Sequence, residues 1–110
     1  MSVSYFVRYE GTAENPDVFL RYYREHHAPI LARFPGIRGI VLHTPMEWRD
    51  RFPVHADRFA LVAQMIFDSA EDLDRALESE ARAEARADFA RFPSFTGSVY
   101  HQAANSEEVA

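Results

Sequence analysis

Hydrophobic residues change their spacing along this chain in a fixed order, and that order restricts the fold more than any single motif does. The two-residue period of a strand occurs at 2–9, 37–44, 58–68 and 94–102. Helical spacing follows the first of these strands, and it returns after the third. The order β-α-β-β-α-β predicts an α+β fold, in which helices cover one face of a ferredoxin-like, four-stranded antiparallel sheet.

The first helical stretch carries both adjacent histidines of the chain. Asn15 is a candidate N-cap, and Pro16 suits the first helical position. Pro29 lacks a backbone donor and crowds the carbonyl of Glu25, so we expect the helix to bend or tighten near the histidines. Aromatic and aliphatic side chains recur at three- and four-residue steps in one stripe: Phe19, Tyr22, Tyr23, His26, His27, Ile30, Leu31 and Phe34.

The second helical region divides into two segments. Ser69 and Asp72 form a capping box that opens the first segment. The register shifts at Ser79, and the second segment carries a new stripe of Ala81, Ala85, Phe89 and Phe92.

The rest of the chain predicts where the domain ends. Gly11 is expected to break the first strand, and residues 46–57 have no period, so we predict a loop there. We assign residues 1–102 to one domain and residues 103–110 to a polar tail that is either loose or reaches a partner chain.

The strand at 58–68 is apolar on both faces, whereas helices can cover only one of them. Leu61, Ala63 and Met65 would lie on one face, with Val62 and Ile66 on the other. Exposing the second face would leave an unusually large apolar patch. We therefore predict a two-fold homodimer in which sheet faces sheet. A few polar strand residues are expected to point into the enclosed space: Ser4, Arg8, Gln64, Thr96 and Ser98.

Composition excludes several classes of partner. The net charge of −5 argues against nucleic-acid binding, which needs a basic surface. There is no cysteine, which excludes disulfides and thiolate metal sites. No apolar run is long enough to span a membrane, and the first residues lack the pattern of a signal peptide. We expect a soluble cytoplasmic protein.

Three segments resemble a known family. An aromatic helix, His-Ala-Pro and then Pro-Gly before a strand occur in "PDVFLRYYREHHAPILARFPGIRGIV", and "QMIFDSAEDL" (64–73) and "ADFARF" (87–92) follow in order. This arrangement resembles the EthD-type proteins, named for a component of ethyl tert-butyl ether degradation, over nearly the whole chain. The resemblance implies a dimeric α+β barrel, in which two ferredoxin-like sheets face each other around a pocket for a small, mostly apolar molecule.

The resemblance implies a class of ligand but no single reaction, because relatives include a methylmuconolactone methylisomerase as well as dehydratase-like and oxygenase-like proteins. We expect a cofactor-independent isomerase, lyase or oxygenase-like enzyme that acts on an aromatic-derived or lactone compound in catabolism. Two alternatives stay open. One is a non-catalytic ligand-binding or accessory protein of a degradation pathway. The other is a haem-binding protein, because other dimeric α+β barrels bind haem through a helix histidine.

His27 is the candidate catalytic residue. An imidazole titrates near neutral pH, and His27 matches the histidine of the family's His-Ala-Pro. The alternative is a core histidine whose ring bonds a backbone carbonyl freed by Pro29. His26 is expected to be structural and to hold either Tyr22 or a strand end.

Four further residues are candidate substrate-binding groups: Arg38, Trp48, Gln64 and His101. Arg38 would pair with a substrate carboxylate, or else be a surface arginine, and Trp48 would orient the ligand. His101 is expected near His27, whereas His43 should differ from His27 by roughly 10 Å in height and form no dyad with it. No metal site and no cofactor are expected, because adjacent histidines point about 100° apart on a helix.

Overall fold

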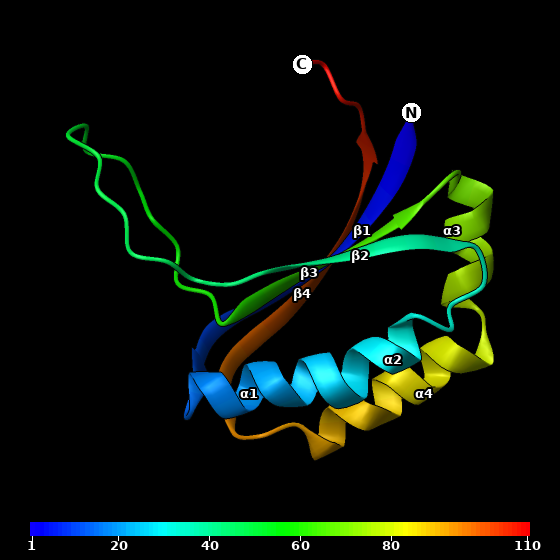
Figure 1. Ribbon diagram of the computed structural model, residues 1–110, viewed down its shortest axis with the longest axis horizontal. Helices are drawn as coiled ribbons and strands as arrows, with labels where there is room; N and C mark the ends of the chain where they lie inside the picture. Colours follow the sequence, from blue (N-terminus) through cyan, green and yellow to red (C-terminus); the bar gives the residue numbers. More distant parts are fainter.

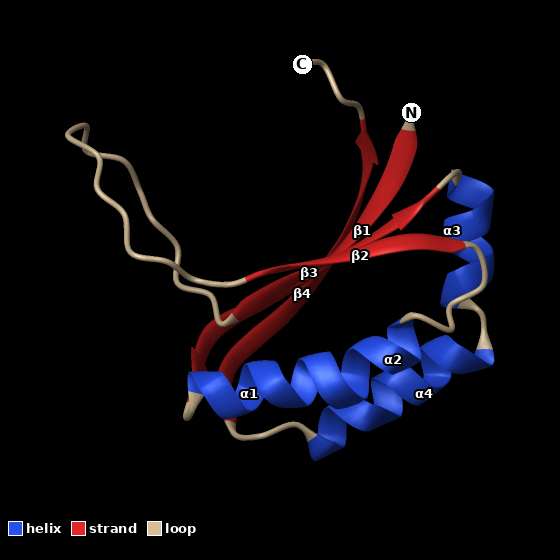
Figure 2. Cartoon of the chain, in the orientation of Figure 1, coloured by secondary structure: helices blue, strands red, loops and turns tan.

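The computed structural model describes residues 1–110 as one four-stranded sheet with helices packed against one side (Figures 1 and 2). Neighbouring strands are all antiparallel, and their order across the sheet is β2-β3-β1-β4. The predicted α+β, ferredoxin-like fold is therefore confirmed. The elements in chain order are β1 (Ser2–Ala13), α1 (Pro16–Tyr22), the π-helix η1 (Tyr23–His27), α2 (Ala28–Leu31), β2 (Ile37–His43), β3 (Leu61–Phe67), α3 (Ala70–Leu77), α4 (Glu80–Asp88), the 3-10 helix η2 (Phe89–Arg91) and β4 (Phe95–Ser106).

The predicted helix starts are confirmed by their capping hydrogen bonds. The side chain of Asn15 accepts the N–H of Val18 at the start of α1, with Pro16 in the first turn. The hydroxyls of Ser69 and Ser79 accept N–H groups at the starts of α3 and α4. The second helical region is thus two helices, as the register shift predicted.

Pro29 changes the helix in a way that differs from the prediction. The helix widens into the π turn η1, in which the N–H of Ala28 bonds the carbonyl of Tyr23 five residues earlier. Pro29 cannot donate to the carbonyl of Glu25, and one extra residue in the preceding turn accommodates that loss. The turn ends at His27, so the sequence around Pro29 sets the position of this side chain.

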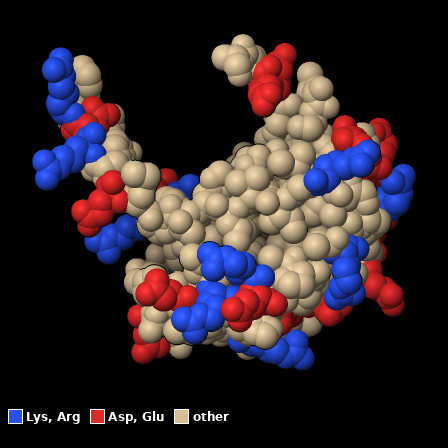
Figure 3. Space-filling view, in the orientation of Figure 1, with Lys and Arg blue, Asp and Glu red and all other residues tan.

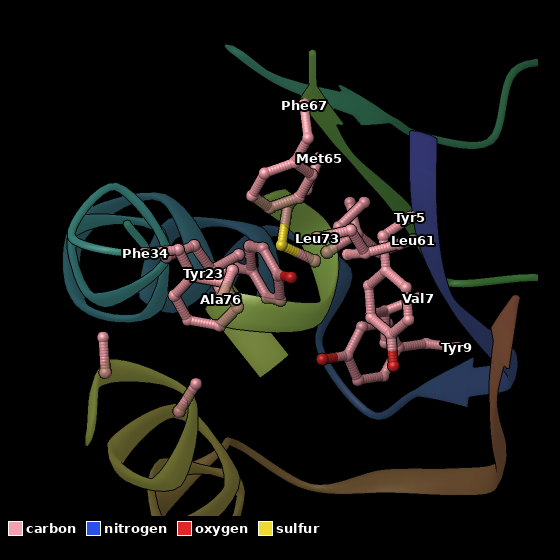
Figure 4. Close-up of a cluster of buried hydrophobic side chains, with 14 of the residues drawn as sticks. Tyr5, Val7, Tyr9, Tyr23, Phe34, Leu61, Met65, Phe67, Leu73 and Ala76 are labelled. Carbon is pink, nitrogen blue, oxygen red and sulfur yellow. The ribbon is translucent and has the colours of Figure 1, made fainter. Parts of the chain in front are cut away.

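The core lies between the helices and one face of the sheet (Figure 4). Strands β1 and β3 contribute alternate residues to this face, which are buried: Val3, Tyr5, Val7, Tyr9, Leu61, Ala63, Met65 and Phe67. The helices cover them with Phe19, Tyr23, Leu31, Phe34, Leu73 and Ala76. We call this the helix-covered face and its opposite the open face.

Both long strands extend further than predicted. The expected break at Gly11 is wrong, because Gly11 pairs with Gly97 and β1 continues to Ala13. Both glycines have positive φ, 140° and 148°, and a Cβ on Gly11 would overlap the carbonyl oxygen of Thr96. Likewise, the predicted tail from residue 103 is partly strand, since β4 remains paired with β1 as far as Ser106.

The open face is more polar than predicted. Apolar side chains do lie there, among them Phe6, Val41, Val62 and Ile66. However, a hydrogen-bonded chain of polar side chains crosses all four strands: His43 to Gln64 at 3.1 Å, Gln64 to Ser4 at 3.2 Å, and Ser4 to Ser106 at 2.7 Å. Figure 3 shows that the charged side chains lie mainly around the rim of the view and on the projecting loop.

The predicted loop at 46–57 is longer in the structure and projects away from the sheet (Figure 1). Residues 44–60, which we call the arm, contain no helix or strand. Arg8 holds the base of the arm through a 2.6 Å ion pair with Asp57. Several large apolar side chains of the arm are exposed: Met46, Trp48, Phe52 and Val54.

Candidate active site

His27 and Asp88 form a buried pair between two helices. His27 ends the π turn, Asp88 ends α4, and each is about 5% exposed. The Nδ1 of His27 lies 2.9 Å from Oδ2 of Asp88, and the hydroxyl of Tyr22 donates to Oδ1 of the same carboxylate at 2.8 Å. Asp88 therefore has a partner on each oxygen, which a buried carboxylate requires.

The surroundings of this pair keep the histidine neutral. Burial lowers the pKa of His27, and the hydrogen bond and charge of Asp88 offset only part of that effect. Burial by itself would raise the pKa of Asp88, but its hydrogen bonds with His27 and Tyr22, together with the charge of Arg91, lower it overall. Since a carboxylate only accepts, Nδ1 of His27 carries the proton, and Nε2 keeps a free lone pair.

His27 lines a small pocket of about 50 Å³ between the helices and the helix-covered face of β1 and β4. His101 lines the same pocket, so the structure brings these two sequence-predicted residues together. The remaining polar lining side chains are Tyr5, Tyr9, Tyr23, Arg82 and Arg86, and the apolar ones are Val7, Leu31, Ala85, Phe89 and Val99.

Tyr5 connects His101 to a positive charge at one end of this pocket. Its hydroxyl lies 2.7 Å from Nδ1 of His101 and accepts a 3.3 Å hydrogen bond from Arg82. Burial lowers the pKa of His101, and the charges of Arg86 and Arg82 lower it further, so this imidazole is also neutral at neutral pH. The tautomer of this neutral ring decides whether the hydroxyl of Tyr5 or Nδ1 of His101 donates in their hydrogen bond.

Two more tyrosine hydroxyls lie in the pocket lining. Burial, together with the neighbouring Tyr9, raises the pKa of Tyr23 well above its ordinary value, and burial likewise raises the pKa of Tyr9. Both groups therefore stay protonated. The hydroxyl of Tyr23 is buried and has no hydrogen-bond partner of suitable geometry, which leaves a polar group available to a ligand.

The other three predicted binding residues lie away from His27. Arg38 is the extra residue of a β-bulge in β2, and its exposed guanidinium pairs with Asp68 at 2.8 Å. Trp48 borders a hollow of about 530 Å³ between the arm and α1. Gln64 belongs to the polar chain of the open face and lines a hollow of about 480 Å³ at the chain ends. These three residues therefore occupy three separate places.

The pocket at His27 is smaller than either of these hollows, yet it holds the groups suited to catalysis. Neither larger hollow contains a buried pair of titratable side chains, and the hollow beside Trp48 is lined largely by exposed residues. Perturbed pKa values and a cavity coincide in this pocket, where His27 and His101 have lowered pKa values and Tyr5, Tyr9 and Tyr23 have raised ones. No group of three or more His, Cys, Asp or Glu side chains is arranged to hold a metal ion.

The remaining histidines take no part in this pocket. The ring of His26 is exposed and stacks on Tyr22 at a centroid distance of 4.8 Å. His43 lies on the open face, where it bonds Gln64.

Sequence reasoning missed Asp88, although the sequence contains a signal for it. Asp88 lies three residues after Ala85 and four before Phe92, so it falls on the buried stripe of its helix. A carboxylate on an apolar stripe must find a buried partner. The alternative of a bond from His27 to a freed backbone carbonyl is wrong, because that partner is Asp88.

Comparison with known proteins identifies related folds. A family model for the EthD domain matches residues 12–96. A solved EthD family protein from Bacillus halodurans is 21% identical with a TM-score of 0.76, covering 97% of this chain and 100% of that one. The cofactor-independent oxygenase SnoaB from Streptomyces nogalater is 18% identical with a TM-score of 0.61, covering 98% and 95%.

A third solved structure is a dimeric protein of unknown function and ferredoxin-like fold from Bacteroides fragilis. It is 15% identical with a TM-score of 0.62, and the match covers 96% of each chain. At these identities the likeness shows the fold alone. None of the curated proteins matches this chain. None of its helices has the length and apolar character that a membrane crossing requires.

Proposed function

The chain belongs to the EthD family, and on that premise we propose that it is a cofactor-independent enzyme in which His27 moves a proton on a small, mostly apolar organic molecule. The buried His27–Asp88 pair is the observation that carries the proposal. Asp88 orients the imidazole and fixes its proton on Nδ1, while burial keeps Nε2 unprotonated. These are the properties of a general base.

The reaction that we propose begins with proton removal next to a carbonyl group. Nε2 of His27 would accept a proton from that carbon, and the electron pair of the broken C–H bond would move to the carbonyl oxygen and form an enolate. Return of the proton at another carbon would give isomerisation. Addition of dioxygen to the carbanion, followed by the same proton, would give a hydroperoxide. Both outcomes use His27 as the base.

The size of the pocket limits what enters it. A volume of about 50 Å³ admits only the reacting end of a substrate, about the volume of one or two water molecules. Aromatic-derived and lactone compounds remain the expected class, with most of the molecule outside the pocket. The haem alternative has no support in this geometry, because a porphyrin is many times larger than the pocket.

We also propose that two copies associate through their open faces. Phe6, Val62 and Ile66 supply apolar area there. The polar side chains between them are already bonded to one another, so covering them would leave few unpaired groups. A relative of the same fold is described as dimeric, which agrees with this arrangement.

Deuterium exchange tests the proposed base without knowledge of the final product. A panel of unsaturated lactones and dihydroxynaphthalenes would be incubated with the protein in D₂O, and exchange at carbon followed by ¹H NMR. We expect the wild type to accelerate exchange on at least one compound, and His27→Gln to lose at least about tenfold of that rate. The variant His26→Gln, which changes the exposed neighbouring ring, serves as the matched control and should retain the rate.

The same experiment separates the enzyme from an accessory protein. Ligand binding without any exchange, detected as a rise in Tm, would favour the alternative of a non-catalytic accessory protein. Exchange that persists undiminished in His27→Gln would remove His27 from the mechanism.

A further inference from the structure

Donors and acceptors are distributed unevenly in the pocket that contains His27. The free Nε2 lone pair of His27 is a strong acceptor, because Asp88 holds the ring proton on Nδ1. The opposite kind of group gathers around Tyr5, whose oxygen accepts a hydrogen bond from Arg82 and whose hydroxyl is hydrogen-bonded to His101. The guanidinium groups of Arg82 and Arg86 are donors whichever tautomer His101 adopts. The pocket thus combines one base with a cluster of donors.

The donor cluster is also positively charged. Neither Arg82 nor Arg86 forms an ion pair, whereas five other arginines of the chain do. No aspartate or glutamate lines the pocket. Both arginines depress the pKa of His101, so their field reaches the groups inside. An uncompensated pair of guanidinium groups at a pocket favours an anionic ligand.

Size and exposure indicate how such a ligand would lie. The cavity of about 50 Å³ matches a carboxylate or a similarly small charged head group and excludes an aromatic ring. Phe89, which is 44% exposed, lines the same pocket and presents an apolar surface at its edge. A ligand with an anionic head and an apolar body would satisfy both features.

We propose that the substrate carries an ionised oxygen group, a carboxylate or a phenolate, which binds between Arg82, Arg86 and His101, while its apolar body contacts Phe89. This inference rests on the proposed function for its relation to His27, because the arginines, His101 and His27 line one pocket. It assigns Arg82 and Arg86 to substrate selection. Within the aromatic-derived and lactone compounds proposed above, the substrate is therefore one that carries an ionised oxygen group.

Binding of small probes tests this inference without any turnover. Benzoate, para-nitrophenolate above its pKa, and the neutral benzyl alcohol would each be titrated while the ring signals of His27 and His101 are followed by NMR. We expect at least one of the two anions to bind about tenfold more tightly than benzyl alcohol, and their comparison shows whether a carboxylate or a phenolate is preferred. Equal affinity for benzyl alcohol and both anions, or no shift with any probe, would overturn the inference.

Three substitutions locate the binding. Arg82→Gln should weaken anion binding about tenfold and leave benzyl alcohol unchanged. Arg82→Lys, which keeps the charge, should restore most of the preference even if its fold is less stable. Arg24→Gln removes the same charge from an exposed position outside the pocket and should change nothing. Anion binding that survives Arg82→Gln and Arg86→Gln would contradict the assignment.

A failure of this inference can be distinguished from a failure of the proposed function. His27→Gln should abolish carbon exchange while leaving benzoate binding in place, because the arginines remain. Anion binding by a protein that exchanges no carbon proton would leave the inference standing and count against the proposed base. Exchange confined to neutral compounds, with no anion binding, would support the proposed base and count against this inference.

Discussion

His27 illustrates how burial and a hydrogen bond can together define one protonation state. The rings of Tyr23 and Phe92 pack against the imidazole, each at a centroid distance of 4.8 Å, and exclude water from it. This apolar contact disfavours the charged form. Asp88 acts in the opposite direction, yet its main effect is to orient the ring and to hold the proton on Nδ1. The outcome is a neutral base with a defined free nitrogen.

Arg91 adds a small contribution to the same group of side chains. It lies 3.7 Å from Oδ1 of Asp88 but is largely exposed, so its charge is screened by water. Tyr22 is the stronger partner of that oxygen, at 2.8 Å. The carboxylate therefore depends on side chains from two helices, and the geometry of the pair depends on how these helices pack.

At the scale of secondary structure, two local irregularities position the site. The π turn before Pro29 ends at His27 and aims it toward α4. The paired glycines Gly11 and Gly97 let β1 and β4 approach closely and continue as long strands. His101 belongs to β4 and Tyr5 to β1, so the far wall of the pocket is built on this strand pair.

The glycine pair can be tested by adding a single methyl group. Gly11→Ala should reduce the free energy of unfolding by about 1–3 kcal/mol, because the new Cβ would overlap the Thr96 carbonyl and the residue would need positive φ. The measurement is chemical denaturation followed by circular dichroism. Gly39→Ala is the matched control, since its Cβ would meet only Ile66 at 3.7 Å. Equal losses in the two variants would refute the role given to the pair.

The sequence predicts which helices and strands form better than it predicts where each strand ends. Asn15, Ser69 and Ser79 act on their own helices through contacts three residues away, so the starts of α1, α3 and α4 were predictable. Whether Gly11 ends a strand depends on Gly97, a residue far away in the chain. The bulge at Arg38 likewise depends on pairing with β3. Such effects have no local signal.

At the scale of the whole molecule, the open face is the surface that remains without cover. Its centre carries Phe6 on β1 beside Gln64 and Gln102 on the neighbouring strands. The apolar area favours association, and the bonded polar chain lowers the cost of burying that face. The helices, by contrast, already bury their apolar stripe in the core.

We expect association through the open face to be sensitive to a charge at its centre. Light scattering after size exclusion should give the wild type twice the 12.7 kDa of one chain. Phe6→Glu should give a folded monomer, because burying an unpaired carboxylate is unfavourable. Val18→Glu places the same charge on an exposed site of α1 and should remain dimeric. A monomeric wild type at micromolar concentration would rule out the proposed dimer.

The site could be predicted only in part, because it depends on contacts between residues that lie far apart in the chain. His27 was predictable from its helical stripe and its resemblance to the family motif. Asp88 lies 61 residues away, and its contact with His27 depends on the packing of two helices. Trp48 and Gln64 have the chemistry of binding residues, but they lie on other surfaces. Trp48 lies on the arm, and Gln64 lies on the open face of the sheet. Residue type alone does not determine these placements.

The protonation state of His27 is the quantity on which the proposed mechanism depends most directly. Long-range ¹H–¹⁵N NMR of the imidazole rings reports which nitrogen carries the proton and how the ring titrates. At neutral pH we expect His27 to be neutral, with its proton on Nδ1, and to protonate only below its ordinary pKa of 6.5. In Asp88→Asn the ring should protonate at still lower pH, because the carboxylate that favours the charged form is gone. A proton found on Nε2, or a charged imidazole at neutral pH, would contradict the account.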